Sequence, residues 1–263
     1  MTHTQDKSSA LRQGLLIFVY LTVLTVLEYL VAVAIKATSI LVVIALVKAG
    51  LVMYYYMHIY KLGEVENEGD EHSYLYKTGT NRLGLWFFLL SDGFVFAGLM
   101  AMRINLLGLT RPPLNQLLGF GVTAVLLLSS FFMNRGETAM AHGDKKAFMN
   151  NTVITFVLGL GFLLGVVLVE WRIAAEEGLV ASFGNTTAGP MGGVFYMMTG
   201  MHAFHVLTGL IFLFVVWNNA RKNLYSAEQH WGVEAATVYW HFVDLVWIFF
   251  YPALYLIGKL IHI

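Results

Sequence analysis

The chain has 263 residues, of which 58% are hydrophobic and 12% are charged. Soluble domains are about 45–50% apolar, with glycine included, and about 25% charged. A soluble domain of this composition could not hide its apolar surface and still present a charged exterior. The composition therefore predicts a membrane protein, and the balance of 16 basic and 16 acidic residues gives no argument for a nucleic-acid partner.

The sequence contains no cysteine. This excludes disulfide partners, thiolate zinc sites, iron–sulfur clusters and a dinuclear copper–thiolate centre. The polar start, residues 1–13, is short, and no small-residue cleavage site follows the first apolar run. We therefore expect that run to be a retained helix and not a signal peptide.

Seven stretches are long and apolar enough to cross about 30 Å of hydrocarbon as helices. Backbone groups in lipid must pair internally, and nothing here alternates like a barrel strand. We predict an all-α integral membrane fold with seven transmembrane helices, which span Gly14–Ile35, Ser39–Tyr60, Leu83–Met102, Asn115–Met133, Thr152–Trp171, Gly193–Trp217 and Ala235–Gly258.

The spacing of these helices predicts three parts: a transmembrane hairpin (1–62), a linker (63–82) and a five-helix bundle (83–263). The linker has no apolar period, so a solvated tether is favoured over a docking surface for a basic partner. Its acidic residues are Glu64, Glu66, Glu68, Asp70 and Glu71.

Basic residues in short loops favour the cytoplasmic side of a membrane. A cytoplasmic N-terminus and an outer C-terminus place ten of them inside and five outside. The inner set is Lys7, Arg12, Lys61, Lys77, Arg82, Arg135, Lys145, Lys146, Arg221 and Lys222, and the outer set is Lys36, Arg103, Arg111, Arg172 and Lys259.

Ionisable side chains at membrane depth are costly, so they mark structural or functional contacts. Glu28 and Lys48 lie nine residues before and eleven residues after Ala37 in the hairpin turn, so their depths match within about 3 Å. We predict an ion pair or a shared neutral hydrogen bond between them. A structural clasp is favoured over a proton route.

Asp92 lies near the middle of the third predicted helix. Hydrocarbon disfavours the charged form of a carboxyl, so we expect Asp92 to be protonated or bonded to a partner. A proton relay and a purely structural carboxyl both remain open. Glu170, at the outer end of the fifth helix, is expected at the interface, where it can reach water.

Two pairs at i, i+3 spacing lie on the last two helices: His202 with His205, and His241 with Asp244. A metal site would need further ligands, so a structural hydrogen-bonding role is favoured for the histidine pair and no metal site is predicted. In the second pair, a neighbouring carboxylate favours a charged imidazolium and fixes its orientation. A haem between His205 and His241 is conceivable but has no support in the sequence.

The segments around Gly200, His202, His205 and Val206, and from Tyr239 to Trp247 (YWHFVDLVW), resemble subunit III of the haem–copper oxidases. The resemblance covers Leu83 to the C-terminus. The hairpin, through Glu28, Lys48 and the segment YYYMHI, resembles the small bacterial oxidase subunit IV.

This resemblance implies a non-catalytic subunit of a proton-pumping terminal oxidase in a bacterial plasma membrane. It implies no cofactor on this chain, haem and copper in catalytic subunit I and copper-bearing subunit II, bound phospholipid, and a role in proton uptake. The family usually has glutamate where this chain has Asp92, whose side chain is one methylene shorter, so the resemblance carries over a hydrogen-bonding role and not a relay geometry.

Other classes of protein stay open at this point. A quinol oxidase or nitric oxide reductase could use a similar subunit, although the pattern is somewhat closer to the cytochrome c type. A small proton channel or transporter could line a path with Glu28, Lys48, Asp92 and Asp244. The paired broken helices common in transporters are not evident.

Overall fold

The computed structural model describes residues 7–35, 37–62, 74–183 and 189–260. Seven helical runs in these residues are long and apolar enough to cross a membrane, which confirms the predicted fold class. They are α1 (Lys7–Ala34), α2 (Thr38–Leu51) with the π-helical turn η1 (Val52–Tyr56), α3 (Tyr74–Leu107), α4 (Gln116–Ala141), α5 (Lys145–Leu164) with the π-helical turn η3 (Gly165–Glu170) and α6 (Trp171–Glu176), α7 (Met191–Arg221), and α8 (Trp231–Tyr251) with the π-helical turn η4 (Pro252–Leu256).

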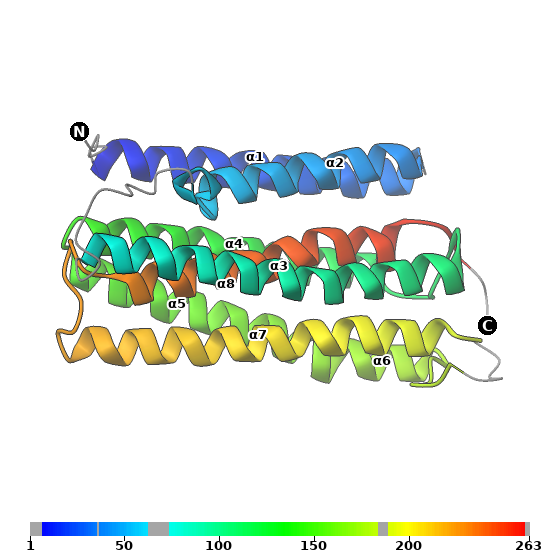
Figure 1. Ribbon diagram of the computed structural model, residues 1–263. Helices are drawn as coiled ribbons and strands as arrows, with labels where there is room; N and C mark the ends of the chain where they lie inside the picture. Colours follow the sequence, from blue (N-terminus) through cyan, green and yellow to red (C-terminus); the bar gives the residue numbers. More distant parts are fainter. Residues whose placement is uncertain (1–6, 36, 63–73, 184–188, 261–263) are drawn as a thin grey trace.

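The hairpin of α1 and α2 forms a layer along one side of the other five spans (Figure 1). A short 3₁₀ turn, η2 (Ile59–Leu62), follows the hairpin at one end of the molecule. At the opposite end, strand β1 (Thr110–Arg111) pairs in parallel with β2 (Lys259–Leu260). The end that holds η2 is called the inner end below and the end that holds the β1–β2 pair the outer end, purely as labels for the two ends of the molecule.

Helix α3 begins earlier than the sequence predicts, so residues 74–82 of the expected linker are helical. Two contacts with α8 hold these first turns: the Tyr74 hydroxyl accepts a hydrogen bond from the Trp231 amide at 3.0 Å, and Arg82 Nη2 lies 2.8 Å from Glu234 Oε1. The rest of the predicted linker, 63–73, with all five of its acidic residues, lies outside the described residues.

Helix α8 is the centre of the bundle. In its most apolar stretch of 18 residues, 83% of the residues are buried, against 17% in the corresponding stretch of α3. Its Trp240 ring lies in a slot between Gly159 of α5 and Gly209 of α7. The Trp240 Nε1 donates to Ser129 Oγ of α4 at 3.1 Å. One side chain of α8 thus contacts three neighbouring helices.

Arg103 is buried inside the outer end of α3, although its position in the sequence suggests an outer loop residue. Its guanidinium donates to four backbone carbonyls, those of Gly108, Thr110, Ala253 and Ile257, at 2.5–3.0 Å. These carbonyls belong to the turn after α3 and to the end of the last span. Arg103 therefore joins the two outer segments by satisfying backbone acceptors that helices leave free at their ends.

The inner end of the hairpin is tied to the bundle by Asp144, the N-cap of α5. Lys7 Nζ donates to its carboxylate at 2.8 Å, and the Ala147 amide donates to it at 3.0 Å. These two hydrogen bonds hold the pKa of Asp144 below its ordinary value. A lowered pKa stabilises the fold above the ordinary carboxyl range, and that stabilisation is lost as the pH falls through the folded-state pKa.

Candidate functional site

Glu28 and Lys48 form a buried ion pair between α1 and α2. Both side chains are at most 1% exposed. The contact agrees with the matched depths in the sequence. Because the pair lies in a low-dielectric interior, each charge depends on the other for compensation.

His241 and Asp244 of α8 are held together by a third residue, Ser130 of α4. The Ser130 hydroxyl lies 2.8 Å from His241 Nδ1 and is hydrogen-bonded to Asp244 Oδ2, whereas Nδ1 and Oδ2 are 3.9 Å apart. The direct carboxylate–imidazole contact expected from the i, i+3 spacing is therefore replaced by a serine bridge. No local pattern in the sequence points to Ser130, since it lies more than a hundred residues away on another helix.

The hairpin covers this serine bridge. The Tyr56 ring of η1 packs on the His241 ring with centroids 4.8 Å apart, and the Tyr56 hydroxyl donates to the Gly14 carbonyl of α1 at 3.2 Å. His58 follows η1 and is also buried. Burial lowers its pKa to about 3, and the nearby Lys61 charge acts in the same direction, so this imidazole is neutral at physiological pH.

Asp92 of α3 meets His205 of α7, with 3.0 Å between Oδ2 and Nε2. The other ring nitrogen, His205 Nδ1, lies 2.8 Å from the Met201 carbonyl, which can only accept. Nδ1 therefore carries the ring proton. The close approach of Asp92 Oδ2 to His205 Nε2 joins α3 to α7.

His202 does not make the hydrogen bonds that were expected of it. Within the described residues neither ring nitrogen has a hydrogen-bond partner, and the ring packs against Trp247 and Phe162, with centroids 4.9 and 5.6 Å away. His202 and His205 thus point to different neighbours. Among the described residues, no three histidine or acidic side chains gather in a geometry that could hold a metal ion.

Glu170 also differs from the prediction. It was expected to reach water at the membrane interface, but its side chain is buried, with 2% of the residue exposed. It ends the π-helical turn η3, and Tyr255 of η4 interacts with its carboxyl. A π-helical turn shifts the face that the following residues present, and such turns are frequent at functional positions. Sequence periodicity does not reveal this shift.

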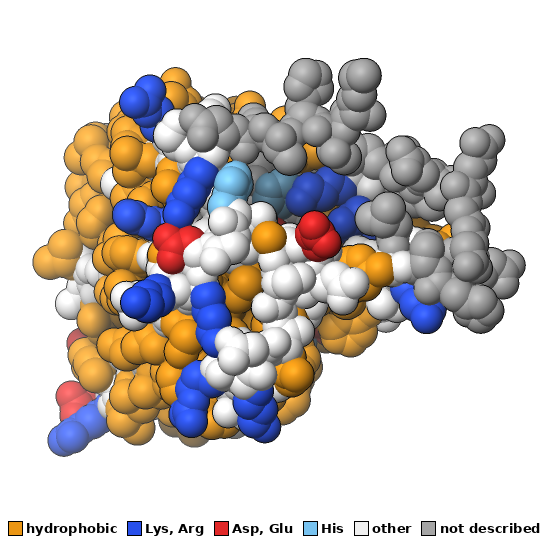
Figure 2. Space-filling view, turned by 90° about the vertical axis from the view of Figure 1, so that its left-hand side faces the viewer, with side chains coloured by type: hydrophobic (Ala, Val, Ile, Leu, Met, Phe, Trp, Pro, Cys, Tyr) orange, Lys and Arg blue, Asp and Glu red, His pale blue; other side chains and the backbone are white. Residues whose placement is uncertain are grey.

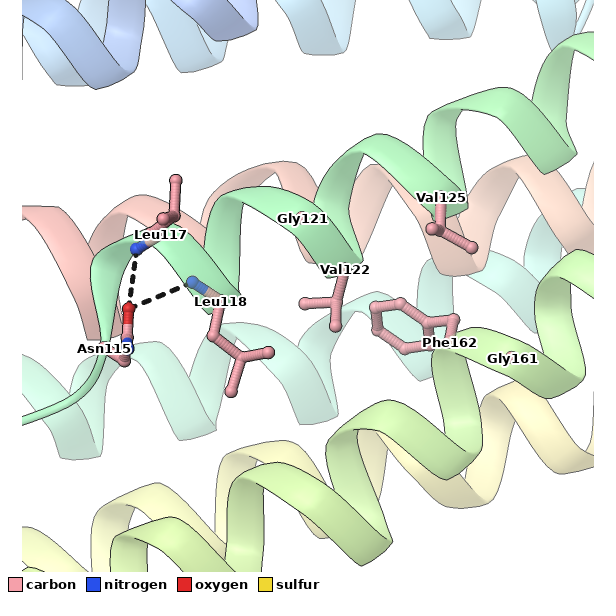
Figure 3. Close-up of a pocket in the computed structure, with 8 residues that line it drawn as sticks. All are labelled: Asn115, Leu117, Leu118, Gly121, Val122, Val125, Gly161 and Phe162. Carbon is pink, nitrogen blue, oxygen red and sulfur yellow. Dashed lines mark hydrogen bonds between the residues drawn. The ribbon is translucent and has the colours of Figure 1, made fainter.

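Two largely apolar pockets open at the surface of the described residues. A groove of about 440 Å³ lies between α4 and α5, and Gly121 and Gly161 leave part of its wall open (Figure 3). A second pocket of about 210 Å³ lies between α1 and α4 near the inner end. Its lining combines the cationic Arg12 and Arg135 with apolar residues such as Leu15 and Phe131.

The fold and these contacts define a polytopic helical membrane protein in which several buried polar side chains pair between helices. A family model described as cytochrome c oxidase subunit III matches residues 3–259 and so includes the hairpin. The chain belongs to the cytochrome c oxidase subunit III family, a non-catalytic subunit of the haem–copper oxidases.

Curated relatives carry the same description. The chain is 35% identical to cytochrome c oxidase subunit 3 of Thermostichus vulcanus over 184 residues, which are 67% of this chain and 87% of that protein. It is 31% identical to the Synechocystis sp. protein, with 74% and 84% covered, and 34% identical to the Felis catus protein, with 68% and 70% covered. The comparisons do not favour an independent transporter or a nitric oxide reductase subunit.

Proposed function

We propose that this chain packs beside a catalytic subunit I that carries haem and copper, close to a copper-bearing subunit II, and sustains proton uptake by that complex. The observation that carries the proposal is the family match over residues 3–259. Cytochrome c is the proposed electron donor. The likeness of the hairpin to a bacterial subunit IV stays a prediction, as does the division of the chain into a hairpin and a bundle.

We propose a bacterial plasma membrane with the N-terminus of the chain cytoplasmic. Figure 2 views the inner end, where basic side chains gather around a few acidic ones. The odd number of described spans supports termini on opposite sides. Lys36, one of the five residues counted for the outer side, lies outside the described residues.

The outward surface of α3 supports contact with a large apolar neighbour or with lipid. Phe87, Phe88 and Phe94 are 63%, 53% and 70% exposed. Affinity purification of the tagged chain from its native membrane is expected to recover an oxidase with haem and copper in other subunits. Recovery of this chain without an oxygen-reducing partner, or with haem bound stoichiometrically to the chain itself, would reject the proposal.

We propose that the Asp92–His205 pair contributes to proton supply. Asp92→Ala is expected to leave assembly largely intact, because α3 keeps its other contacts, and to shorten the catalytic lifetime of the complex several-fold. Counting turnovers before inactivation measures this effect. Asp92→Glu retains a carboxyl and serves as the control. A wild-type lifetime and proton stoichiometry in Asp92→Ala would count against the role.

We also propose that the pocket beside Arg12 and Arg135 binds an anionic phospholipid, with its phosphate near the guanidinium groups. Arg12→Gln with Arg135→Gln is expected to remove phospholipid that co-purifies with the wild-type complex. Arg172→Gln is the control, because Arg172 is exposed and paired only within its own helix. Lipid mass spectrometry compares the three complexes, and equal phospholipid content in all of them would argue against the site.

A further inference from the structure

The serine bridge at the hairpin–bundle interface has more hydrogen-bonding partners than its one hydroxyl proton can serve. Ser130 has one hydroxyl proton but two close partners, His241 Nδ1 and Asp244 Oδ2. A hydroxyl can donate only once, so one partner must donate to the Ser130 oxygen. Either the carboxyl of Asp244 is protonated, or Nδ1 of His241 is.

These two arrangements interconvert without a change in net charge. With the imidazole protonated on Nε2, the Asp244 O–H bond breaks and its proton moves to Ser130 Oγ, while the Ser130 proton moves to His241 Nδ1. The neutral pair becomes a carboxylate and an imidazolium. All three side chains are buried, at 2% exposed for Ser130, 0% for His241 and 3% for Asp244, and an apolar interior favours the neutral arrangement.

A small cavity connects this bridge to the hairpin. It measures about 10 Å³ and is lined by Asp244, Lys48, Thr25 and Thr123, among other residues. The second carboxyl oxygen of Asp244 is buried and has no hydrogen-bond partner within the described residues. This volume is at the lower bound of what a single water needs, which is about 10–15 Å³ of probe-occupied space, and a water there would accept from Lys48 and donate to Asp244.

Lys48 is common to the two buried clusters. Its ammonium pairs with Glu28, and the residue is also one of those that line the cavity of Asp244. While Glu28 holds a negative charge, Lys48 is compensated, and a second carboxylate at Asp244 would be unbalanced. Loss of the charge of Glu28 leaves Lys48 to favour the Asp244 carboxylate. Among the described residues, the other ionisable groups facing the bridge are Tyr56 and His58 of the hairpin.

We propose that Asp244, Ser130 and His241 form a buried proton-holding site that takes one exchangeable proton and one water, and that Glu28 sets its charge through Lys48. The resting proton lies on the Asp244 carboxyl. This site lies between α4, α8 and the hairpin, and is distinct from the Asp92–His205 pair between α3 and α7.

Infrared spectroscopy of the intact oxidase complex tests the site through the C=O stretch of protonated carboxyls. We expect one such band to be lost in Asp244→Asn, to change frequency in Ser130→Ala, and to shift in D₂O in the wild type as the proton exchanges. Ser129→Ala is the matched control, because it removes a neighbouring buried hydroxyl that bonds Trp240 and leaves the band unchanged. Glu28→Gln should reduce the band as Asp244 ionises.

The proposal fails if no protonated-carboxyl band depends on Asp244, or if the band does not respond to Ser130→Ala. It fails equally if the band does not shift in D₂O while the complex stays folded, because a proton that cannot exchange has only a structural role. Should Asp244→Asn prevent assembly, the comparison of Ser130→Ala with Ser129→Ala still decides the question. A band that responds equally to both serine variants would overturn the bridge.

Discussion

Lys48→Leu is expected to destabilise the hairpin by about 3–5 kcal/mol, because it removes one partner of a buried ion pair and leaves the Glu28 carboxylate uncompensated. The pair is among the least exposed in the described chain, with side chains at 1% and 0%. Surface ion pairs contribute only about 0–1 kcal/mol. The burial of the pair is therefore the reason for the large effect.

The double variant Lys48→Leu, Glu28→Leu should recover most of the lost stability, because no charge then stays buried. Thermal dissociation of the purified complex, compared across the two single variants and the double variant, measures the coupling. Lys222→Leu provides the control, since it removes an exposed lysine at the end of α7. If the single and double variants lose equal stability, the pair contributes packing and not charge compensation.

The membrane spans and the Glu28–Lys48 contact could be predicted from the sequence, because each depends only on residues that are close together along the chain. Hydrophobic length fixes a span, and equal distance from a short turn fixes the relative depth of two residues on adjacent helices. The family resemblance came from two motifs on the last two helices, one around His202 and His205 and one from Tyr239 to Trp247. None of these inferences needs the arrangement of distant helices.

Ser130 and Arg103 could not be found in this way. Ser130 is an ordinary helical serine until the packing of α4 on α8 brings it between His241 and Asp244. Arg103 looks like a loop residue by charge, but the turn that follows α3 folds back and supplies carbonyls to it. Tertiary contacts decide both roles, so a single sequence contains no local signal for them.

Packing of Trp240 between two glycines leads to the second large expected effect. A Cβ added at Gly159 would lie 2.7 Å from Trp240 Cζ2 and 3.1 Å from Leu210 Cδ2. A Cβ at Gly209 would lie 2.9 Å from Trp240 Cε3 on the other side of the slot. The indole is held on both sides, and its Nε1 bonds Ser129, so it cannot move away from either added methyl group without losing a contact.

Gly159→Ala is therefore expected to destabilise the bundle by about 1–3 kcal/mol through overpacking. Gly161→Ala on the same helix is the matched control, because its Cβ would meet nothing within 4 Å. Replacing a helical glycine by alanine in open space should stabilise by about 0.5–1 kcal/mol. The two alanine variants should thus shift thermal dissociation of the complex in opposite directions.

A smaller ring should relieve the clash if Trp240 is its cause. Trp240→Phe alone is expected to be destabilising, because it leaves a void and deprives Ser129 of the indole N–H. Combined with Gly159→Ala, it should cost less than the sum of the two single changes, since the methyl group occupies space that the indole vacates. If the two losses of stability are additive, Gly159 is needed for a reason other than room for Trp240. The packing of α8 at the centre of the bundle would then depend on contacts other than the slot around Trp240.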